Sequence, residues 1–469
     1  MTERPHLAVI GAGPAGLAAT VAAAAHGVRV TLIDSAAEAG GQFYRQPAAA
    51  LRARHPESPQ HGGRTWERLR DALRTHQQAR TVSHLTDHHV WFIEPRDAGF
   101  TVHALFGPEQ EDSVGVRADA VLLATGGYEK VLPFPGWTLP GVVTAGGAQA
   151  MLKGTLAVSG RTAVVAGTGP LLLPVATGLA AAGVEIAALV ESATPGAFLR
   201  RAAALSARPD KAAEGAGYAL RLLRHRVPTL LGHTVTEAHG TARLEAVTVA
   251  ALDRDGRARP ETRRRIACDT LATGHGMLPH TDLAGGLGCR LEGTHVGVDA
   301  EQRTDVPGVW AAGESTGIGG AALALAEGHI AGRSAAARLR GTEPDPRAWA
   351  AAARARTRLR AFATTLDTVY APPAHWTERI TDDTVVCRCE EVTGGAVREA
   401  VEQLGAGDVR TVKLLTRAGM GWCQGRMCAP AVAGLAGCEP RPDRRPFARP
   451  VPLGVLAREP APTTEEGPS

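Results

Sequence analysis

Leu7-Ala-Val-Ile-Gly-Ala-Gly-Pro-Ala-Gly16 decides the fold of this 469-residue chain. Its first four residues are apolar and predict a short buried strand, and the glycine-rich remainder predicts a tight turn into a helix over residues 15–26. A second apolar run over residues 28–33 predicts the next strand, which ends in Asp34. Strand, turn, helix, strand and acid in this order are the layout of a dinucleotide-binding unit.

Each glycine of the turn has a separate task in such a unit. Gly11 permits the tight turn, Gly13 lets the backbone approach a pyrophosphate, and Gly16 allows close packing of helix on strand. The helix N-terminus stabilises the phosphates, and Asp34 can accept hydrogen bonds from ribose hydroxyls. The first forty residues therefore predict a dinucleotide site.

The same stretch could be mistaken for a membrane span, because residues 7–25 carry no charge. A parallel strand buried on both faces and a buried helix are apolar for another reason, and three glycines with Pro14 mark the turn between them. The apolar run over residues 162–190 has the same explanation. We expect neither a transmembrane segment nor a targeting segment.

Length and charge exclude some classes of protein. A chain of 469 residues can form two or three domains, each with its own core. The formal net charge is +4, and its basic residues are scattered among acidic ones, so nucleic acid is not indicated as a partner. Seven cysteines without a disulfide framework fit a reducing cytoplasm, and a peripheral place at the inner face of a membrane stays open.

Three later segments identify the dinucleotide. Residues 119–126 and 269–274 are strands that each end in Ala-Thr-Gly, and residues 304–314 end in Gly-Glu314. They resemble the paired turns and the late Gly-Asp element of flavoproteins of the glutathione reductase type, in which the late acid contacts the ribityl chain of FAD. Glu314 stands where that family has Asp. A helix over 321–338 should follow, with its N-terminus facing the flavin.

A second unit repeats the layout imperfectly. A strand over 162–166 leads into Gly167-Thr-Gly169, and a later strand ends in Glu191, but the third glycine position is Leu172. Helix and strand therefore cannot pack as closely. Glu191 would repel a 2′-phosphate, so NAD rather than NADP would bind. The alternative is a domain that no longer binds a nucleotide and only packs.

Four cysteines near the C-terminus form two pairs, Cys387 with Cys389 and Cys423 with Cys428. Thiolates arranged in this way hold a [2Fe-2S] cluster or a structural zinc ion. Three glycines around the second pair leave backbone N–H groups free to approach cluster sulfides, and a Cys-x-Cys pair is tight for zinc, so the local sequence favours iron. Four unrelated thiols are a further alternative. Residues 40–45 carry no Cys-x-x-Cys beside the flavin, which leaves the cluster as the exit for electrons.

The remaining segments connect and end the chain. We expect a turn-rich linker over 341–347, a helix over 348–369 that packs on its own domain, and a helix capped by Thr393 that carries Val397, Val401 and Leu404. Beyond Cys438 the chain is proline- and arginine-rich, and we expect disorder from Glu459.

With these segments in place, the chain resembles the alpha subunits of the hydrogen cyanide synthase, opine oxidase and D-hydroxyproline dehydrogenase group, from about Leu7 to about Pro452. The most specific parts are residues 132–146, 167–174, 387–390 and 419–428. The cluster segment resembles bacterioferritin-associated ferredoxin. The resemblance implies an α/β fold with two dinucleotide-binding domains, Rossmann-like and of the glutathione reductase type, and a small C-terminal helical [2Fe-2S]-binding domain.

The expected domains are a first part of the FAD domain over 1–154, a second nucleotide domain over 155–265, the rest of the FAD domain over 266–340, a linker over 341–380, a cluster domain over 381–440 and a Pro-rich tail over 441–469. The residues expected at the FAD are Gly11, Gly13, Pro14, Ala15, Gly16, Asp34, Gly41, Gln42, Ala124, Thr125, Gly126, Gly313, Glu314, Gly319 and Gly320. Gly167, Gly169 and Glu191 are expected at a second nucleotide, and Cys387, Cys389, Cys423 and Cys428 at the cluster. The sequence assigns no catalytic residue.

The resemblance also implies partners. In that group a separate beta subunit, similar to D-amino-acid oxidase, oxidises the C–N bond of an amine or imino acid, so we expect a flavoprotein partner, room for a small third subunit, and a dye or quinone as electron acceptor. Two alternatives stay open. One is a stand-alone NADH-dependent reductase, and the other is a non-enzymatic scaffold with a structural metal.

Overall fold

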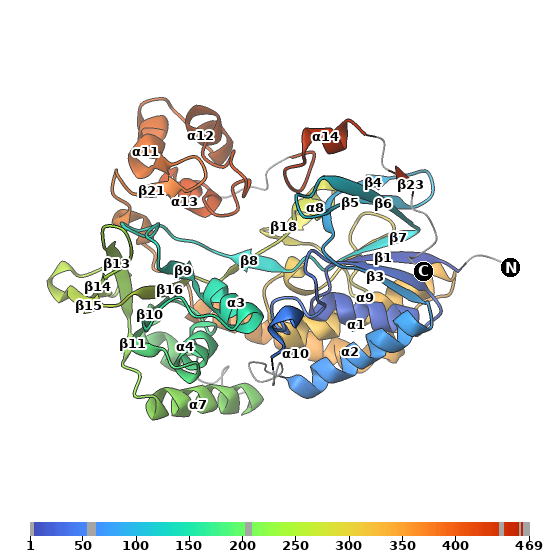
Figure 1. The fold of residues 1–469 in the computed structure, drawn as a ribbon, viewed down its shortest axis with the longest axis horizontal. Helices are drawn as coiled ribbons and strands as arrows, with labels where there is room; N and C mark the ends of the chain where they lie inside the picture. Colours follow the sequence, from blue (N-terminus) through green and yellow to red (C-terminus); the bar gives the residue numbers. More distant parts are fainter. Residues whose placement is uncertain (1–3, 54–61, 202–208, 440–444, 459–460, 463–469) are drawn as a thin grey trace.

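The computed structural model describes residues 4–53, 62–201, 209–439, 445–458 and 461–462. Two five-stranded parallel sheets form the body of the molecule, and a small helical unit lies against them at the upper left of Figure 1. No helix in the described part of the chain is long and apolar enough to cross a membrane.

The first sheet has the strand order β20-β7-β1-β2-β3. These strands are β1 (His6–Ile10), β2 (Arg29–Ile33), β3 (Val82–Leu85), β7 (Ala120–Leu123) and β20 (Val309–Ala311). Alternate side chains of β1 face opposite cores: Leu7 and Val9 pack with α1 (Pro14–Ala24), while Ala8 and Ile10 pack with the meander sheet. That meander contains β4 (His89–Pro95), β5 (Phe100–Phe106) and β6 (Asp112–Ala118).

Helix α9 (Ala321–Leu339) crosses α1 at very short range. A Cβ atom at Gly328 would lie 2.1 Å from the carbonyl oxygen of Ala15, and one at Gly332 would lie 2.3 Å from that of Ala19. Two glycines four residues apart on α9 therefore allow its backbone to touch that of α1. Helix α2 (Gly63–Gln78) packs beside them.

The second sheet has the order β12-β11-β10-β16-β9. Its strands are β9 (Val142–Thr144), β10 (Thr162–Gly167), β11 (Glu185–Glu191), β12 (Thr229–Leu231) and β16 (Thr270–Gly274). Helices α3 (Ala145–Thr155) and α4 (Leu172–Ala181) cover one face, and the antiparallel strands β13 (His233–His239), β14 (Ala246–Ala251) and β15 (Arg264–Ala267) cover the other. Strands β8 (Gly127–Glu129) and β17 (Met277–Pro279) pair antiparallel where the chain passes between the two sheets.

Helix α10 (Ala350–Val369) packs along α9, with Leu359, Ala363 and Val369 buried. This is the helix that the apolar stripe predicted. The domain boundaries named above stay predictions.

The small helical unit contains β21 (Val385–Cys387), β22 (Val392–Thr393), α11 (Gly394–Glu402), α12 (Val409–Thr416) and α13 (Ala429–Leu435). The Thr393 hydroxyl accepts a hydrogen bond from the Ala396 N–H and caps α11, as expected. Leu404 was wrongly assigned to this helix. It lies beyond the end of α11 and is exposed, because the helix stops at Glu402 before a further turn can bring Leu404 onto the core.

The C-terminal segment differs from expectation. Residues 445–458 lie on the meander sheet, where Phe447 and Val455 pack with Trp91, and α14 (Leu453–Leu456) follows. Ala461 and Pro462 form β23, parallel to β6, although we expected disorder from Glu459. Proline is tolerated there because β23 is an edge strand. Residues 459–460 and 463–469, on which the rest of that expectation falls, lie outside the described residues.

The remaining described elements are short or peripheral. They are η1 (Ala49–Leu51), α5 (Pro195–Arg200), α7 (Pro209–Arg224), η2 (Pro260–Thr262), α8 (Asp282–Gly286), β18 (Leu291–Glu292), β19 (His295–Val296), η3 (Gly313–Thr316), η4 (Pro346–Trp349) and η5 (Trp376–Arg379).

Candidate cofactor sites

A cavity of about 2880 Å³ runs between the two parallel sheets and reaches the small helical unit. Its walls include most of the residues expected at the first nucleotide, namely Gly11, Gly13, Pro14, Asp34, Gly41, Gln42, Ala124, Thr125, Gly126, Glu314, Gly319 and Gly320. They also include Gly169 of the second turn and Cys423. Ala15, Gly16, Gly313, Gly167, Glu191, Cys387, Cys389 and Cys428 do not line it.

The first glycine turn forms a cradle that is open only on the cavity side. A Cβ atom at Gly11 would lie 2.3 Å from the carbonyl oxygen of Ala124, and one at Gly16 would lie 1.8 Å from that of Gly11. A Cβ atom at Gly13 would have no other atom within 4 Å, so the space above this glycine is free. A backbone that packs tightly underneath and is bare above suits a pyrophosphate.

Neighbouring segments close the ends of this cradle. Gly41 lies against Gly13, where an added Cβ would come within 2.8 Å of the Gly13 Cα. The Asp34 carboxylate accepts hydrogen bonds from the N–H groups of Ala12 and Ala36, the latter at 2.7 Å. Asp34 thus stabilises the turn through one face of its carboxylate while it also borders the cavity.

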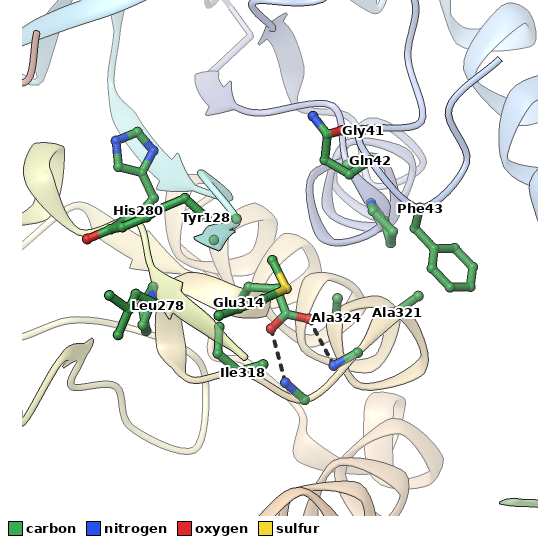
Figure 2. Close-up of a pocket in the computed structure, with 18 of the residues that line it drawn as sticks. Gly41, Gln42, Phe43, Tyr128, Leu278, His280, Glu314, Ile318, Ala321 and Ala324 are labelled. Carbon is green, nitrogen blue, oxygen red and sulfur yellow. Dashed lines mark hydrogen bonds between the residues drawn. The ribbon is translucent and has the colours of Figure 1, made fainter. Parts of the chain in front are cut away.

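Glu314 is turned toward the start of α9. Its carboxylate accepts hydrogen bonds from the N–H of Gly319 at 3.1 Å and from that of Gly320 at 2.9 Å (Figure 2). Burial raises the pKa of this carboxyl, against the effect of those two bonds. The N–H groups that lead into α9, at the helix end that we expected to face the flavin, are therefore already bonded to the acid that replaces the family's Asp.

A second acid supports this corner from below. Glu327 is only 1 % exposed and accepts hydrogen bonds from the Gly313 N–H and the Thr316 hydroxyl, each at 2.9 Å. Arg360 of α10 donates to Glu327 and, at 2.8 Å, to the Gly317 carbonyl. Burial raises the pKa of Glu327, while Arg360 acts to lower it. The arginine thus locks the Gly313–Gly317 segment in place.

The second glycine turn has a different geometry. A Cβ atom at Gly167 would lie 1.7 Å from the carbonyl oxygen of Gly274, so this contact resembles the one at Gly11. Leu172, however, packs into the core on α3 and α4, and α4 begins only at this residue. Close packing at the third glycine position is thus replaced by a buried side chain, as the sequence predicted.

Glu191 lies behind that turn and is buried. Its carboxylate accepts hydrogen bonds from the Gly169 N–H at 3.2 Å and the Ala193 N–H at 2.8 Å. Burial raises the pKa of Glu191 to about 7 in spite of these bonds. It is therefore engaged by the protein's own backbone and lies away from the cavity wall.

The four cysteines expected at a cluster come together in two pairs. The Cys428 thiol donates a hydrogen bond that lowers the pKa of Cys387 to about 5, while the same contact and burial raise the pKa of Cys428. A backbone hydrogen bond from Cys423 acts to lower the pKa of Cys389, but burial and the charge of the Cys423 sulfur raise it. No three His, Cys, Asp or Glu side chains among the described residues are arranged to hold one metal ion.

Backbone N–H groups surround these sulfurs. Those of Gly419, Glu390 and Cys389 donate to the Cys387 sulfur. An added Cβ at Gly421 would lie 2.1 Å from that of Cys389, so only glycine lets the two cysteine segments approach each other. Four thiols in two pairs, with N–H donors around them, fit a [2Fe-2S] cluster.

Sequence reasoning missed the residues that join the two regions. Arg426 lies between Cys423 and Cys428 in the chain and donates to Asp282 of α8. An arginine inside a cysteine pair is a signal that could have been noticed, whereas nothing in the sequence points to Asp282. Glu129 was also missed; it accepts hydrogen bonds from Gly146 and Gly147 at the start of α3.

Comparison with known proteins agrees with these sites. Residues 5–335 match the pyridine nucleotide-disulphide oxidoreductase family, and residues 385–436 match the BFD-like [2Fe-2S] binding domain. The hydrogen cyanide synthase subunit HcnB of Pseudomonas aeruginosa is 35 % identical over 437 residues, which cover 91 % of each chain. An opine oxidase subunit of Agrobacterium tumefaciens is 33 % identical, over 93 % of this chain and 86 % of its own.

Among solved structures, L-proline dehydrogenase from P. horikoshii aligns with a TM-score of 0.66 at 19 % identity, over 98 % of this chain and 81 % of its own, which shows a shared fold. FAD and a [2Fe-2S] cluster are the cofactors of this oxidoreductase. The chain thus belongs to the pyridine nucleotide-disulphide oxidoreductase family, as a member that ends in a BFD-like [2Fe-2S] domain.

Proposed function

We propose that this chain is the electron-transfer alpha subunit of a heteromeric dehydrogenase or oxidase that acts on amino acids, imino acids or opines. One observation carries the proposal: Cys423 of the cluster pairs borders the same cavity as Gly13 and Glu314 of the FAD site. Two redox cofactors that share a cavity can exchange electrons without a mobile carrier.

The residue assignment follows from the geometry. Gly11, Gly13 and Gly16 hold the pyrophosphate of FAD at the start of α1, and Asp34 lies at the ribose. Cys387, Cys389, Cys423 and Cys428 hold the cluster. The other assigned FAD residues are Pro14, Ala15, Gly41, Gln42, Ala124, Thr125, Gly126, Gly313, Glu314, Gly319 and Gly320.

FAD supplies exchange of one or two electrons, and the cluster carries one electron at a time. The chain's own residues bind and orient these groups. Arg360 and Glu327 hold the Gly313–Gly317 segment, and the N–H groups around Cys387 tune its sulfur. No described residue forms a recognisable site for oxidation of a small amine, which places that step on a partner.

The partner we propose is a flavoprotein similar to D-amino-acid oxidase, with a small third subunit optional and a dye or quinone as final acceptor. The support is that the similar proteins are themselves subunits, namely HcnB, the opine oxidase chain and, over 58 % of this chain, the alpha subunit of sarcosine oxidase from Corynebacterium. We also propose a cytoplasmic location, since all seven cysteines are free.

The test is anaerobic mixing of the purified chain with opines, proline, hydroxyproline, glycine and sarcosine, while its flavin absorbance is followed. We expect no reduction by the chain alone and rapid reduction once the partner flavoprotein is added. Rapid reduction of the isolated chain by any of these compounds would contradict the proposal.

A second candidate is a stand-alone NADH reductase. Gly169 favours it, because this glycine lines the common cavity and has free space above it. Rapid bleaching of the flavin by NADH would support this candidate, whereas an unchanged flavin spectrum at millimolar NADH would exclude it. In either case NAD at the second site would be measured directly, by release of nucleotide from the denatured protein.

The cluster assignment has its own experiment. Cys423→Ser should remove the iron and the visible absorption of the cluster and leave FAD in place. Full iron content in this variant, or stoichiometric zinc in the unmodified protein, would contradict it.

A further inference from the structure

Arg426 joins the cluster unit to the FAD-binding unit. Its Nε and Nη2 atoms lie 3.0 and 2.6 Å from Oδ2 of Asp282, and Nη2 also donates to the Ala448 carbonyl at 2.6 Å. Both charged side chains are 22 % exposed. Arg426 is the third residue after Cys423 and the second before Cys428, so its contact fixes the loop that carries both cysteines.

The contact continues to the turn that borders the FAD site. His280 Nε2 lies 3.2 Å from the same Asp282 oxygen, and the His280 carbonyl accepts a hydrogen bond from the Thr125 hydroxyl at 2.6 Å. Thr125 is the middle residue of the first Ala-Thr-Gly turn. The His280 ring also meets that of Tyr128 edge to face, and both side chains lie across the cavity from Gly41 and Gln42 (Figure 2).

The Asp282 carboxylate is suited to the centre of such a bridge. Burial acts to raise its pKa, but the hydrogen bond with His280 and the charge of Arg426 outweigh burial and lower it, so the group is ionised at neutral pH. Arg445, the fourth member of this cluster of charges, places Nη2 3.5 Å from Oδ1.

The other pair of cysteines is fixed to the second sheet's unit instead. Trp137 donates from Nε1 to the Val385 carbonyl at 2.6 Å, two residues before Cys387, and the Arg388 guanidinium lies over the Trp137 ring. Met427, next to Arg426, packs into the core between the second sheet and β13–β15. The two cysteine segments are thus attached to different parts of the body.

We propose that Arg426 is a positioning residue that, through Asp282 and His280, holds the Cys423–Cys428 loop at a fixed separation from the Thr125 turn, so that electrons pass between FAD and cluster without movement of the small unit. The proposal rests on the proposed electron-transfer function. Its specific content is that the rate of transfer depends on a contact whose FAD-side partner touches neither cofactor assigned above.

The experiment compares three variants. Arg426→Gln and Asp282→Asn break the bridge from opposite sides. Arg417→Gln is the matched control, because Arg417 forms an ion pair with Glu390 at 2.9 Å on the surface of the same small unit and makes no contact with Asp282. For each, iron and FAD content, both midpoint potentials, hydrogen exchange over residues 126–129 and 423–428, and the rate at which the cluster is reduced after light-driven reduction of the flavin are measured.

We expect both bridge variants to slow cluster reduction by about tenfold or more and to raise exchange in the two segments, with potentials unchanged, because small displacements of reacting groups have large effects on rates. Arg417→Gln should behave as the unmodified protein. If Arg426→Gln loses its iron, Asp282→Asn, which lies outside the cysteine loop, decides the question. Unmodified rates in Asp282→Asn with full cofactor content would overturn the proposal, and so would equal slowing by Arg417→Gln.

Failure of the broader function gives a different result. If electrons do not pass from flavin to cluster in the unmodified protein, the proposed function fails. If they pass there and also in the bridge variants at equal rates, only the positioning role fails.

Discussion

The two glycine turns of this molecule share a sequence layout but begin their helices differently. In the first unit, α1 starts at Pro14, and the Leu17 N–H donates to the Gly13 carbonyl at 2.9 Å in a regular α-helical bond. In the second unit, α4 starts two positions later, at Leu172, whose N–H donates to Gly169 at 3.2 Å in the tighter i to i−3 pattern.

One side chain accounts for the difference. Gly16 lets α1 lie against the Gly11 carbonyl, where an added Cβ would come within 1.8 Å. Leu172 cannot take that position and is buried in its own core instead. The comparison shows that the third glycine decides whether the helix N-terminus is presented to a phosphate, even when both earlier glycines are kept.

The largest effect is expected at Gly13. Its φ of −73° suits any residue, and its Cβ position is free of protein atoms, so Gly13→Val should fold but place two methyl groups where the pyrophosphate lies. We expect FAD affinity to fall more than about 100-fold, equivalent to about 3 kcal/mol. Flavin absorbance after gel filtration measures it. Gly217→Val, on an exposed part of α7, is the control, and full flavin in Gly13→Val would refute the assignment.

The second unit should respond through stability instead. Leu172 is 2 % exposed, so Leu172→Ala removes packing and leaves a cavity, which costs about 3 to 5 kcal/mol. Urea unfolding measures the loss, and flavin content should stay complete. Leu220→Ala, at a position 69 % exposed, should change stability by less than about 0.5 kcal/mol. A loss of FAD in Leu172→Ala without loss of stability would show that the second turn serves the flavin.

Glu191 gives the second unit a dependence on pH. Because its pKa in the folded protein is raised from 4.5 to about 7, the folded state keeps a proton that the unfolded chain has lost. Stability should therefore fall as pH rises from about 4.5 to about 7, by at most about 3 kcal/mol from this group. Glu191→Gln cannot ionise and should lack this slope when unfolding is measured at pH 5 and pH 8. Parallel pH profiles for the two proteins would contradict the expectation.

The smallest difference concerns the acids that bond to helix starts. Glu314 is the only side chain that bonds to the N–H groups leading into α9, among the contacts of the described residues, whereas α3 has both Glu129 and the Thr144 hydroxyl. A glutamine keeps one acceptor oxygen of two. We expect Glu314→Gln to cost about 2 kcal/mol and Glu129→Gln about 1 kcal/mol, by urea unfolding. The reverse order would mean that Thr144 adds nothing to α3.

Local patterns predicted much of this structure. The apolar run before Gly11, the two Ala-Thr-Gly strand ends and the Thr393 cap depend on neighbours within a few residues, and each was found where the sequence indicated. The four cysteines could be grouped because they are the only closely spaced ones.

What could not be predicted depends on residues far apart in the chain. Asp282 and Arg426 are 144 residues apart, and Arg360 reaches Glu327 across two helices. Neither pair leaves a periodic signal. The C-terminal segment was misjudged because composition was read alone; Phe447 and Val455 gain their order from Trp91, more than 350 residues earlier.

That C-terminal segment has a practical consequence for expression and fusion of the protein. The match to the [2Fe-2S] domain ends at residue 436, which invites truncation shortly afterwards. Such a fragment would keep every assigned ligand yet uncover Trp91, which packs under Phe447 and Val455, and would remove the Ala448 carbonyl that Arg426 contacts. A fragment that is complete by its family matches would thus have a sticky aromatic face and a loosened metal domain.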